Sequence, residues 1–315
     1  TLKNSRRNVL KDKTLNDLQG NREDRSISSI APKLTLKPSG RDSIIIDASY
    51  TDIQYDDSDQ QDSDRVGAGV LWLHNLSAVD AFSAQLQYQD VSFDKSPTNN
   101  DYEYYLATIG YQATLSRLSY SVNAGVNQSK RKADDYDGYY FNGNFDYKYH
   151  ANTIALALVH ELTDTSRGNN NEGSGDFNNS SGSVDIFERT NAEISFSNQS
   201  MCSTCSIRVF VLTELEDYEN LNQDSREFRA GVDFGYQINR QLSASFDVDY
   251  SELRFVNGNT NADYDTLSYR LRLKQSLLRD LSLAWFVSFE DKASQGGLQN
   301  YDELSGGVSL SYRFD

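Results

Sequence analysis

Segments in which every second residue is apolar recur along almost the whole chain. In REFRAGVDFGYQI, residues 226–238, the apolar Phe228, Val232 and Phe234 alternate with Arg229 and Asp233. The pattern returns in LSASFDVDY, LSYRLRLKQ and LSLAWFVSF, which begin at residues 242, 267 and 281. Because successive side chains of a strand point to opposite faces, this alternation predicts β-strands with one apolar and one polar face. No run has convincing helical periodicity, so we predict an all-β chain.

The length and the charge of these segments indicate where the strands lie. They run for about 10–15 residues, whereas strands of soluble sheets usually have about 5–6. A tilted strand that crosses a bilayer needs about 9–11 residues. The last segment, LSGGVSLSYRF, ends in Phe314, and bacterial outer-membrane barrels commonly close on such an aromatic residue. We therefore predict a transmembrane antiparallel up-and-down β-barrel in the bacterial outer membrane.

The connections between the segments alternate in length, and this predicts a topology. Outer-membrane barrels have short periplasmic turns and longer outer loops. About fifteen strands follow from Ile27 onward, and an even count requires TLKNSRRNVL as a weak first strand. We predict about 16 strands in a single domain, residues 1–315, with the weak first strand and first outer loop in 1–26. The short connections are 37–41, 75–80, 116–118, 150–152, 200–204, 239–241 and 277–280, and the long ones are 56–64, 94–101, 131–137, 165–183 (the longest), 220–225, 257–263 and 292–300.

Composition limits the partners of the chain. Its formal net charge of −16 argues against nucleic acid, because phosphate binding needs a basic face. Runs of about 18 apolar residues are absent, so we expect no transmembrane helix. The expected partners are outer-membrane lipid and lipopolysaccharide. The chain begins at Thr1 without a visible signal peptide, as expected for a processed or trimmed form.

Several longer stretches carry a family resemblance. They are SSIAPKLTLKPSGRDSIIIDASY, ATIGYQATLSRLSYSVNAGVNQSKRK, DGYYFNGNFDYKY, ALVHELTDTSRG, EFRAGVDFGYQINRQLSASFDVDYSEL and GGVSLSYRF. With them the chain resembles the outer-membrane β-barrel proteins encoded beside exopolysaccharide and exosortase (PEP-CTERM) gene clusters. The resemblance implies a barrel through which a secreted polysaccharide crosses the outer membrane, with periplasmic export proteins as further partners. It implies no catalytic residues. The start departs from the family pattern, which has a signal peptide and a fuller first strand.

Charged residues gather on the predicted polar face toward the end of the chain. One interpretation is a lumen lining that binds or filters solute, as rings of charge do in pores. The other is a ladder of cross-strand ion pairs that only solvates and stiffens the wall. The predicted lumen-lining residues are Arg208, Arg229, Asp233, Asp247, Asp249, Arg270, Arg272, Lys274, Glu290 and Arg313.

Four aromatic residues, Tyr104, Tyr140, Phe210 and Phe286, also fall on the predicted polar face. Such rings in a channel could form a stacking track for sugar rings. Local packing against a loop or plug is the alternative for the same four residues.

Two cysteines, Cys202 and Cys205, lie in a predicted periplasmic turn. The periplasm oxidises thiols, so we predict a disulfide. A redox motif would need a thioredoxin-like context, and a zinc site would need two further ligands nearby. We expect no metal and no cofactor. The acidic run at 56–64 could bind Ca²⁺ between lipopolysaccharide phosphates, or it is a solvated loop.

The three histidines bear on catalysis. A lipase-type barrel would need a Ser–His pair on its outer face. His74 and His150 fall at predicted periplasmic turns, and no local motif marks a partner Ser for His160. We therefore expect no catalytic residues and no enzyme. The function expected is export of a secreted exopolysaccharide through the outer membrane. The alternatives are a general or solute-selective diffusion porin, and a scaffold barrel that holds a periplasmic or surface partner protein.

Overall fold

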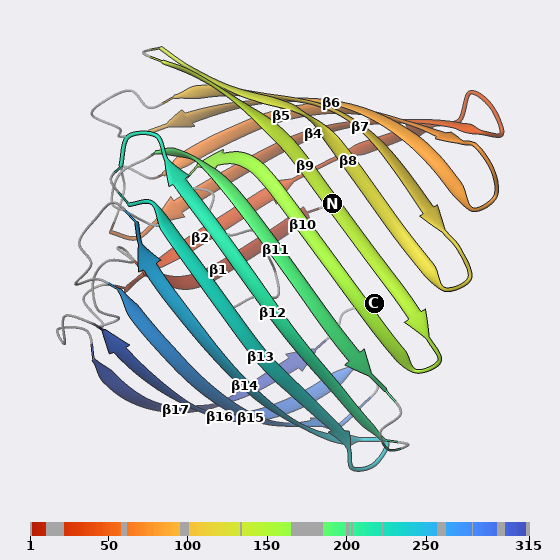
Figure 1. Ribbon diagram of the computed structural model, residues 1–315. Helices are drawn as coiled ribbons and strands as arrows, with labels where there is room; N and C mark the ends of the chain where they lie inside the picture. Colours follow the sequence, from red (N-terminus) through yellow and green to blue (C-terminus); the bar gives the residue numbers. More distant parts are fainter. Residues whose placement is uncertain are drawn as a thin grey trace. The chain divides into compact units, whose positions relative to one another are not determined.

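The computed structural model describes residues 2–10, 22–57, 62–94, 101–132, 134–164, 185–199, 202, 204–221, 223–256, 263–278, 280–294 and 300–312. These residues form 17 β-strands (Figure 1). No helix among them is long and apolar enough to cross a membrane. The strands are β1 (Leu2–Leu10), β2 (Arg22–Ile30), β3 (Lys33–Leu36), β4 (Asp42–Tyr55), β5 (Ser63–Asn75), β6 (Asp80–Phe93), β7 (Tyr102–Thr114), β8 (Leu118–Arg131), β9 (Asp135–Tyr149), β10 (Asn152–Asp164), β11 (Ile186–Asn198), β12 (Cys205–Tyr218), β13 (Ser225–Gln237), β14 (Leu242–Phe255), β15 (Tyr264–Ser276), β16 (Leu281–Ser294) and β17 (Tyr301–Tyr312).

Strands β2 and β3 are two pieces of one interrupted strand. Both pair with β4 in the same register, in which Ile30 faces Tyr50 and Lys33 faces Asp47. The interruption falls at Ala31 and Pro32, and proline has no N–H to give to the ladder. The 17 strands therefore form 16 strand lines, the even number that was predicted. The predicted weak first strand exists as β1, which pairs with β2.

Successive strands run antiparallel, and their connections gather at two ends. At the short-turn end the connections are 37–41, 76–79, 115–117, 150–151, 199–204, 238–241 and 277–280, close to the predicted short set. The long-loop end holds the others.

Two predicted boundaries at the long-loop end were wrong. The connection predicted at 131–137 is only 132–134, because β8 and β9 continue almost to the loop tip, and Arg22–Arg25 of the predicted first outer loop belong to β2. The predicted longest loop, 165–183, lies outside the described residues.

Each strand has an apolar face and a polar face, as the alternation predicted. In β13, β14 and β15, register places Phe234, Phe246 and Leu271 in one transverse row on the apolar face. These side chains are 38%, 43% and 55% exposed although they are large and apolar. The neighbouring row on the polar face holds Asp233 and Asp247. An extended exposed apolar surface of this kind is typical of a protein that contacts lipid or a partner.

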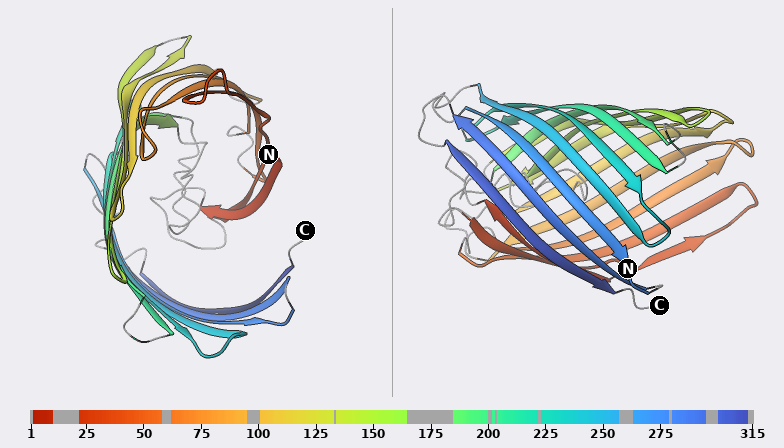
Figure 2. Two further views of the ribbon diagram at one scale, coloured as in Figure 1. Left: turned by 90° about the vertical axis from the view of Figure 1, so that its right-hand side faces the viewer. Right: turned by 90° about the horizontal axis from the view of Figure 1, so that it is seen from below.

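The chain divides into two compact units. Unit 1 comprises residues 1–144, 158–190 and 216–224, and unit 2 comprises 145–157, 191–215 and 225–315. Strands β9–β12 contribute residues to both units. Within unit 2, β13–β17 lie side by side in chain order (Figure 2).

Polar side chains form a rim on the apolar face of unit 1 at the short-turn end. Asp42 accepts hydrogen bonds from Ser39 Oγ at 2.5 Å and from Trp72 Nε1 at 3.1 Å, and its Oδ1 lies 2.8 Å from His74 Nδ1. The Trp72 ring also meets Phe82 edge-on. Toward the long-loop end, Tyr50, Tyr88 and Tyr105 make a second group, with hydrogen bonds from Tyr50 to Asp64 and from Tyr105 to Glu103. Two aromatic rims around an apolar band are typical of membrane barrels.

A repeated side-chain contact closes five hairpins at the long-loop end. In each one an Asp or Asn just before the second strand accepts a hydrogen bond from the last backbone N–H of the first strand. Asp263, for example, binds the Phe255 N–H at 2.8 Å. Such Asx contacts satisfy a donor that the ladder leaves free. The other four pairs are Asp62 with Tyr55, Asp101 with Phe93, Asp224 with Tyr218 and Asn300 with Ser294.

Candidate functional site

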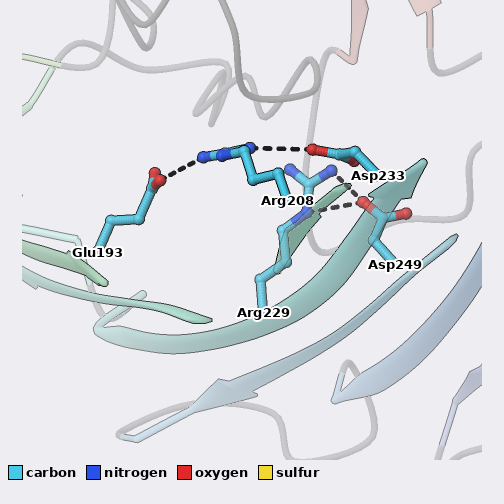
Figure 3. A network of polar contacts seen from close by, with 5 residues as sticks. All are labelled: Glu193, Arg208, Arg229, Asp233 and Asp249. Carbon is cyan, nitrogen blue, oxygen red and sulfur yellow. Dashed lines mark hydrogen bonds and ion pairs between the residues drawn. The ribbon is translucent and has the colours of Figure 1, made fainter. Parts of the chain in front are cut away.

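Two arginines on the polar face of unit 2 are held in ion pairs between neighbouring strands (Figure 3). Arg208 of β12 pairs with Glu193 of β11, and its Nη1 lies 3.1 Å from Asp233 Oδ2 of β13. Arg229 of β13 donates from Nε to Asp249 Oδ1 of β14 at 2.8 Å. Each of the two guanidiniums therefore makes the cross-strand ion pairs that the ladder interpretation describes.

Phe210 lies beside the same two arginines. The guanidinium carbons of Arg208 and Arg229 lie 4.7 and 5.8 Å from its ring centroid, within the range of a cation–π contact. Gly231 of β13 makes room for the ring, because a Cβ there would lie 2.6 Å from Cε1 and Cζ of Phe210. The residue is only 8% exposed. Local packing, the alternative to a stacking role, therefore describes Phe210.

A second set of basic residues on the same face is exposed. Arg270, Arg272 and Lys274 occupy three successive polar-face positions of β15. None of the three makes an ion pair with any residue that the structure describes. This unpaired set, Arg270, Arg272 and Lys274, is called the basic row below.

Two members of the basic row, Arg272 and Lys274, have no acidic neighbour across the strands, whereas Arg270 stands in register with Asp247 without forming an ion pair with it. Arg272 lies in register with Ser245 of β14 and Phe286 of β16, and Lys274 lies in register with Ser243 and Ala284. These transverse rows continue to Gly235 and Gln237 on β13 and to Gly307 and Ser309 on β17, so neither contains an acidic residue across the five strands. The positive charge of the basic row is therefore not neutralised by a direct cross-strand neighbour at Arg272 or Lys274.

The acidic residues gather further toward the long-loop end. Asp249, Ser268, Glu290 and Glu303 stand in one transverse row. Ser268 donates to Asp249, and Tyr301 donates to Glu290 at 2.5 Å. The next row toward the short-turn end holds Asp233 and Asp247 beside Arg270. Toward the short-turn end the polar face of β13–β17 thus changes from these acidic rows to the basic row, while Arg229 and Lys292 stand in the row on the other side of them. Arg313, also predicted to line the lumen, lies outside the described residues.

The polar face of unit 1 is filled by its own side chains. Arg65 of β5 and Asp164 of β10 form a bidentate pair at 3.0 and 2.9 Å, and both are 2% exposed. Tyr102 donates to the same carboxylate at 2.5 Å. A cluster of Val91, Phe93, Tyr102, Leu162 and Ile186 surrounds this contact, with Tyr104 packed against it. Tyr104 is therefore a packing residue. Tyr140 lies half-buried on β9 and engages a neighbour as well.

The cysteines and histidines have local roles in the structure. Cys202 and Cys205 form a disulfide. Cys202 lies in the connection 199–204, and Cys205 is the first residue of β12. His74 joins the Asp42 rim. His150, with a φ of 55°, occupies the two-residue turn 150–151, where such left-handed backbone is common. In the acidic run at 56–64, Asp62 and Asp64 accept hydrogen bonds from Tyr55 N and Tyr50 Oη.

Sequence reasoning missed the glycines beneath the aromatic rings. Gly307 of β17 lies in register with Phe286, and a Cβ there would lie 2.7 Å from Cε1 and Cζ of the ring. Of the four predicted aromatic residues, Phe286 is the one that stands in a row with an unpaired cation, Arg272. An aromatic residue opposite a glycine on a polar face would have been the signal, but finding it requires the strand register.

Comparison with known proteins gives the fold. No protein-family model matches the sequence, and no curated protein sequence is significantly similar to it. Among solved structures, the copper transporter OprC matches with a TM-score of 0.59 at 10% identity, over 98% of this chain and 59% of that chain. A mutant of the ferric enterobactin receptor PfeA from Pseudomonas aeruginosa matches with a TM-score of 0.53 at 8% identity, over 98% and 58%. OmpT of Vibrio cholerae matches with a TM-score of 0.45 at 9% identity, over 89% and 99%.

The likenesses to OprC and PfeA agree with the apolar face, the two aromatic rims and the even number of strand lines. The chain is a bacterial outer-membrane β-barrel. In a barrel of this kind the apolar face meets lipid and the polar face lines the lumen, so the two faces are called the lipid face and the lumen face below. At this level of identity the likeness establishes the fold alone, because one fold serves many functions.

The expectation that the chain is not an enzyme is corrected. It rested on the absence of a local motif that marks a partner Ser for His160, and in the structure His160 Nδ1 lies 2.8 Å from a different hydroxyl, Thr190 Oγ1 on the neighbouring strand. The outer-membrane β-barrel fold by itself neither requires nor excludes catalysis. The exclusion of catalysis is therefore withdrawn, and no activity is assigned.

Proposed function

We propose that this barrel is a channel for hydrophilic solutes and that it favours anions. The observation that carries the proposal is the basic row: Arg272 and Lys274 stand on the lumen face in transverse rows that contain no acidic side chain across the five strands β13–β17. Charged residues that line a pore raise the local concentration of ions of opposite sign. An anion that passes along β15 would meet three exposed cations in succession.

The test is the zero-current potential of the purified protein in a planar lipid bilayer under a KCl gradient. We expect Cl⁻ to pass more readily than K⁺. Replacing Arg270, Arg272 and Lys274 together by Gln should abolish this preference while the channel still conducts. The matched control is Arg226→Gln, which removes a positive charge from the lipid-face side of β13. A wild-type barrel that inserts and does not conduct would contradict the proposal.

Export of a secreted exopolysaccharide is the second candidate. The resemblance to barrels of exopolysaccharide gene clusters suggested it, and Phe286 on the lumen face beside Arg272 favours it, because a ring and a cation together suit an acidic sugar. In a deletion strain the polymer should accumulate in the periplasm. Normal surface polysaccharide in that strain would remove this candidate and leave the diffusion channel.

The proposed sidedness places the short-turn end in the periplasm, with the long loops outside. The disulfide between Cys202 and Cys205 belongs to the short-turn end. After reduction, a maleimide on a polyethylene glycol too large to pass through the channel should label these cysteines in spheroplasts and not in intact cells. Labelling of intact cells would invert the topology.

A further inference from the structure

The lumen face around Phe286 combines a ring, a cation and hydroxyl groups within one small area of four paired strands. Phe286 lies over Gly307, so the ring rests on bare backbone rather than on another side chain. Arg272 is its neighbour on β15. The surrounding lumen-face positions are mostly serines. We call this area the Phe286 patch; it consists of Ser243, Ser245, Asp247, Arg270, Arg272, Lys274, Ala284, Phe286, Ser288, Ser305, Gly307 and Ser309, and Asp247 stands at its edge opposite Arg270.

We propose that the Phe286 patch binds a saccharide that carries carboxylate groups, with one sugar ring on Phe286 and its carboxylate on Arg272. This inference rests on the proposed channel function and names a substrate class for the same lumen. The electron-rich face of an aromatic ring attracts the polarised C–H groups of a sugar. A guanidinium forms paired hydrogen bonds with a carboxylate. The serine hydroxyls can donate to or accept from sugar hydroxyls.

The spacing of the basic row suits a polymer better than a single small anion. Alternate residues of a strand are about 6.7 Å apart, so the three cations form a regular line along β15. A chain with an acid group on successive sugars can meet them one after another. The contacts are shallow and exposed, which allows release as well as binding and therefore movement along the lumen.

The other aromatic residues of the lumen face do not offer the same chemistry. Phe210 is 8% exposed and already lies beside Arg208 and Arg229. Tyr104 packs against the buried cluster of unit 1. The charge around Phe286 also differs, because the row of Phe286 and Arg272 holds no carboxylate across β13–β17; Asp233 and Asp247 stand one lumen-face row further toward the long-loop end, and Asp249, Glu290 and Glu303 stand two rows further. An acidic ligand therefore finds its most favourable position at Arg272 and Lys274.

The test is block of single-channel current by hexagalacturonate, compared with the neutral maltohexaose. The acidic sugar should block wild type at a lower concentration. Phe286→Ala should raise the half-blocking concentration of hexagalacturonate about tenfold, and Arg272→Gln should do so for the acidic sugar alone. The matched control is Phe289→Ala on the lipid face of the same strand, which should leave block unchanged. Phe286→Leu, which keeps apolar bulk without a ring, should behave like Phe286→Ala.

Binding is also measured by titration calorimetry on the refolded barrel in detergent micelles, so the result does not depend on conduction. A barrel that binds hexagalacturonate and does not conduct would overturn the channel and support the site. Conduction without binding would overturn the site and leave the channel. Equal block by maltohexaose, stronger block by ATP, or binding that Phe286→Ala and Arg272→Gln leave unchanged would each overturn the proposal.

Discussion

The lumen face of β5–β10 and the lumen face of β13–β17 treat their charged residues differently. In the first region Arg65 and Asp164 are paired, buried and surrounded by apolar side chains. In the second region Arg270, Arg272 and Lys274 are exposed, and none of them forms an ion pair with a described residue. Alternation along the strand is the same in both regions. It assigns a residue to a face, whereas the residues across neighbouring strands decide whether its charge is neutralised.

The largest effect is expected from Asp164→Ala, which removes the carboxylate that pairs with buried Arg65. We expect the free energy of unfolding to fall by roughly 3–5 kcal/mol, because a buried charge then lacks its counter-ion. Urea unfolding in lipid vesicles measures this change. The double variant Arg65→Met with Asp164→Leu removes both charges and should recover most of the loss. If the Asp164→Ala variant were as stable as wild type, the buried ion pair of the first region would not stabilise the barrel, and the two regions would not differ in this respect.

A smaller effect is expected from Gly231→Ala in the second region. The new Cβ would lie 2.6 Å from the Phe210 ring, which must shift away from Arg208 and Arg229. We expect a loss of about 1–3 kcal/mol in unfolding free energy, the usual range for overpacking. Gly40→Ala is the matched control, because a Cβ there meets nothing within 4 Å. Equal losses of unfolding free energy in the two variants would mean that the contact between Gly231 and Phe210 does not stabilise the barrel.

The smallest effect separates paired from unpaired arginines of the lumen face. Arg208→Gln breaks two half-exposed ion pairs and should lower the unfolding free energy by about 0.5–1 kcal/mol. Arg272→Gln breaks no ion pair with a described residue and should leave the unfolding free energy unchanged, while it lowers the preference for anions. Urea unfolding and zero-current potentials, measured on both variants, would separate the effect on stability from the effect on anion preference. A destabilised Arg272→Gln would mean that Arg272 belongs to the ladder.

The sequence predicts the strands well because a half-buried strand imposes a period of two at every position. Residues 267–273 of β15 show this, because apolar residues of the lipid face and polar residues of the lumen face alternate there without a break. The pairing of Arg229 with Asp249 could not be predicted, because it depends on the register of two strands. Tyr104 and Phe286 share the same alternation, yet one packs into a cluster and the other lies over a glycine. Their difference comes from the residues on neighbouring strands, which the sequence of a single strand does not contain.

The central claim is that the polar face of β15 lines a water-filled lumen and that its apolar face meets lipid. Single cysteines at positions 270–274, placed in a background without Cys202 and Cys205, test it in the barrel reconstituted in lipid vesicles. A water-soluble maleimide should label Arg270→Cys, Arg272→Cys and Lys274→Cys strongly, and Leu271→Cys and Leu273→Cys weakly. Strong labelling of Leu271→Cys and Leu273→Cys with weak labelling of the other three, or equal labelling of all five, would contradict the account.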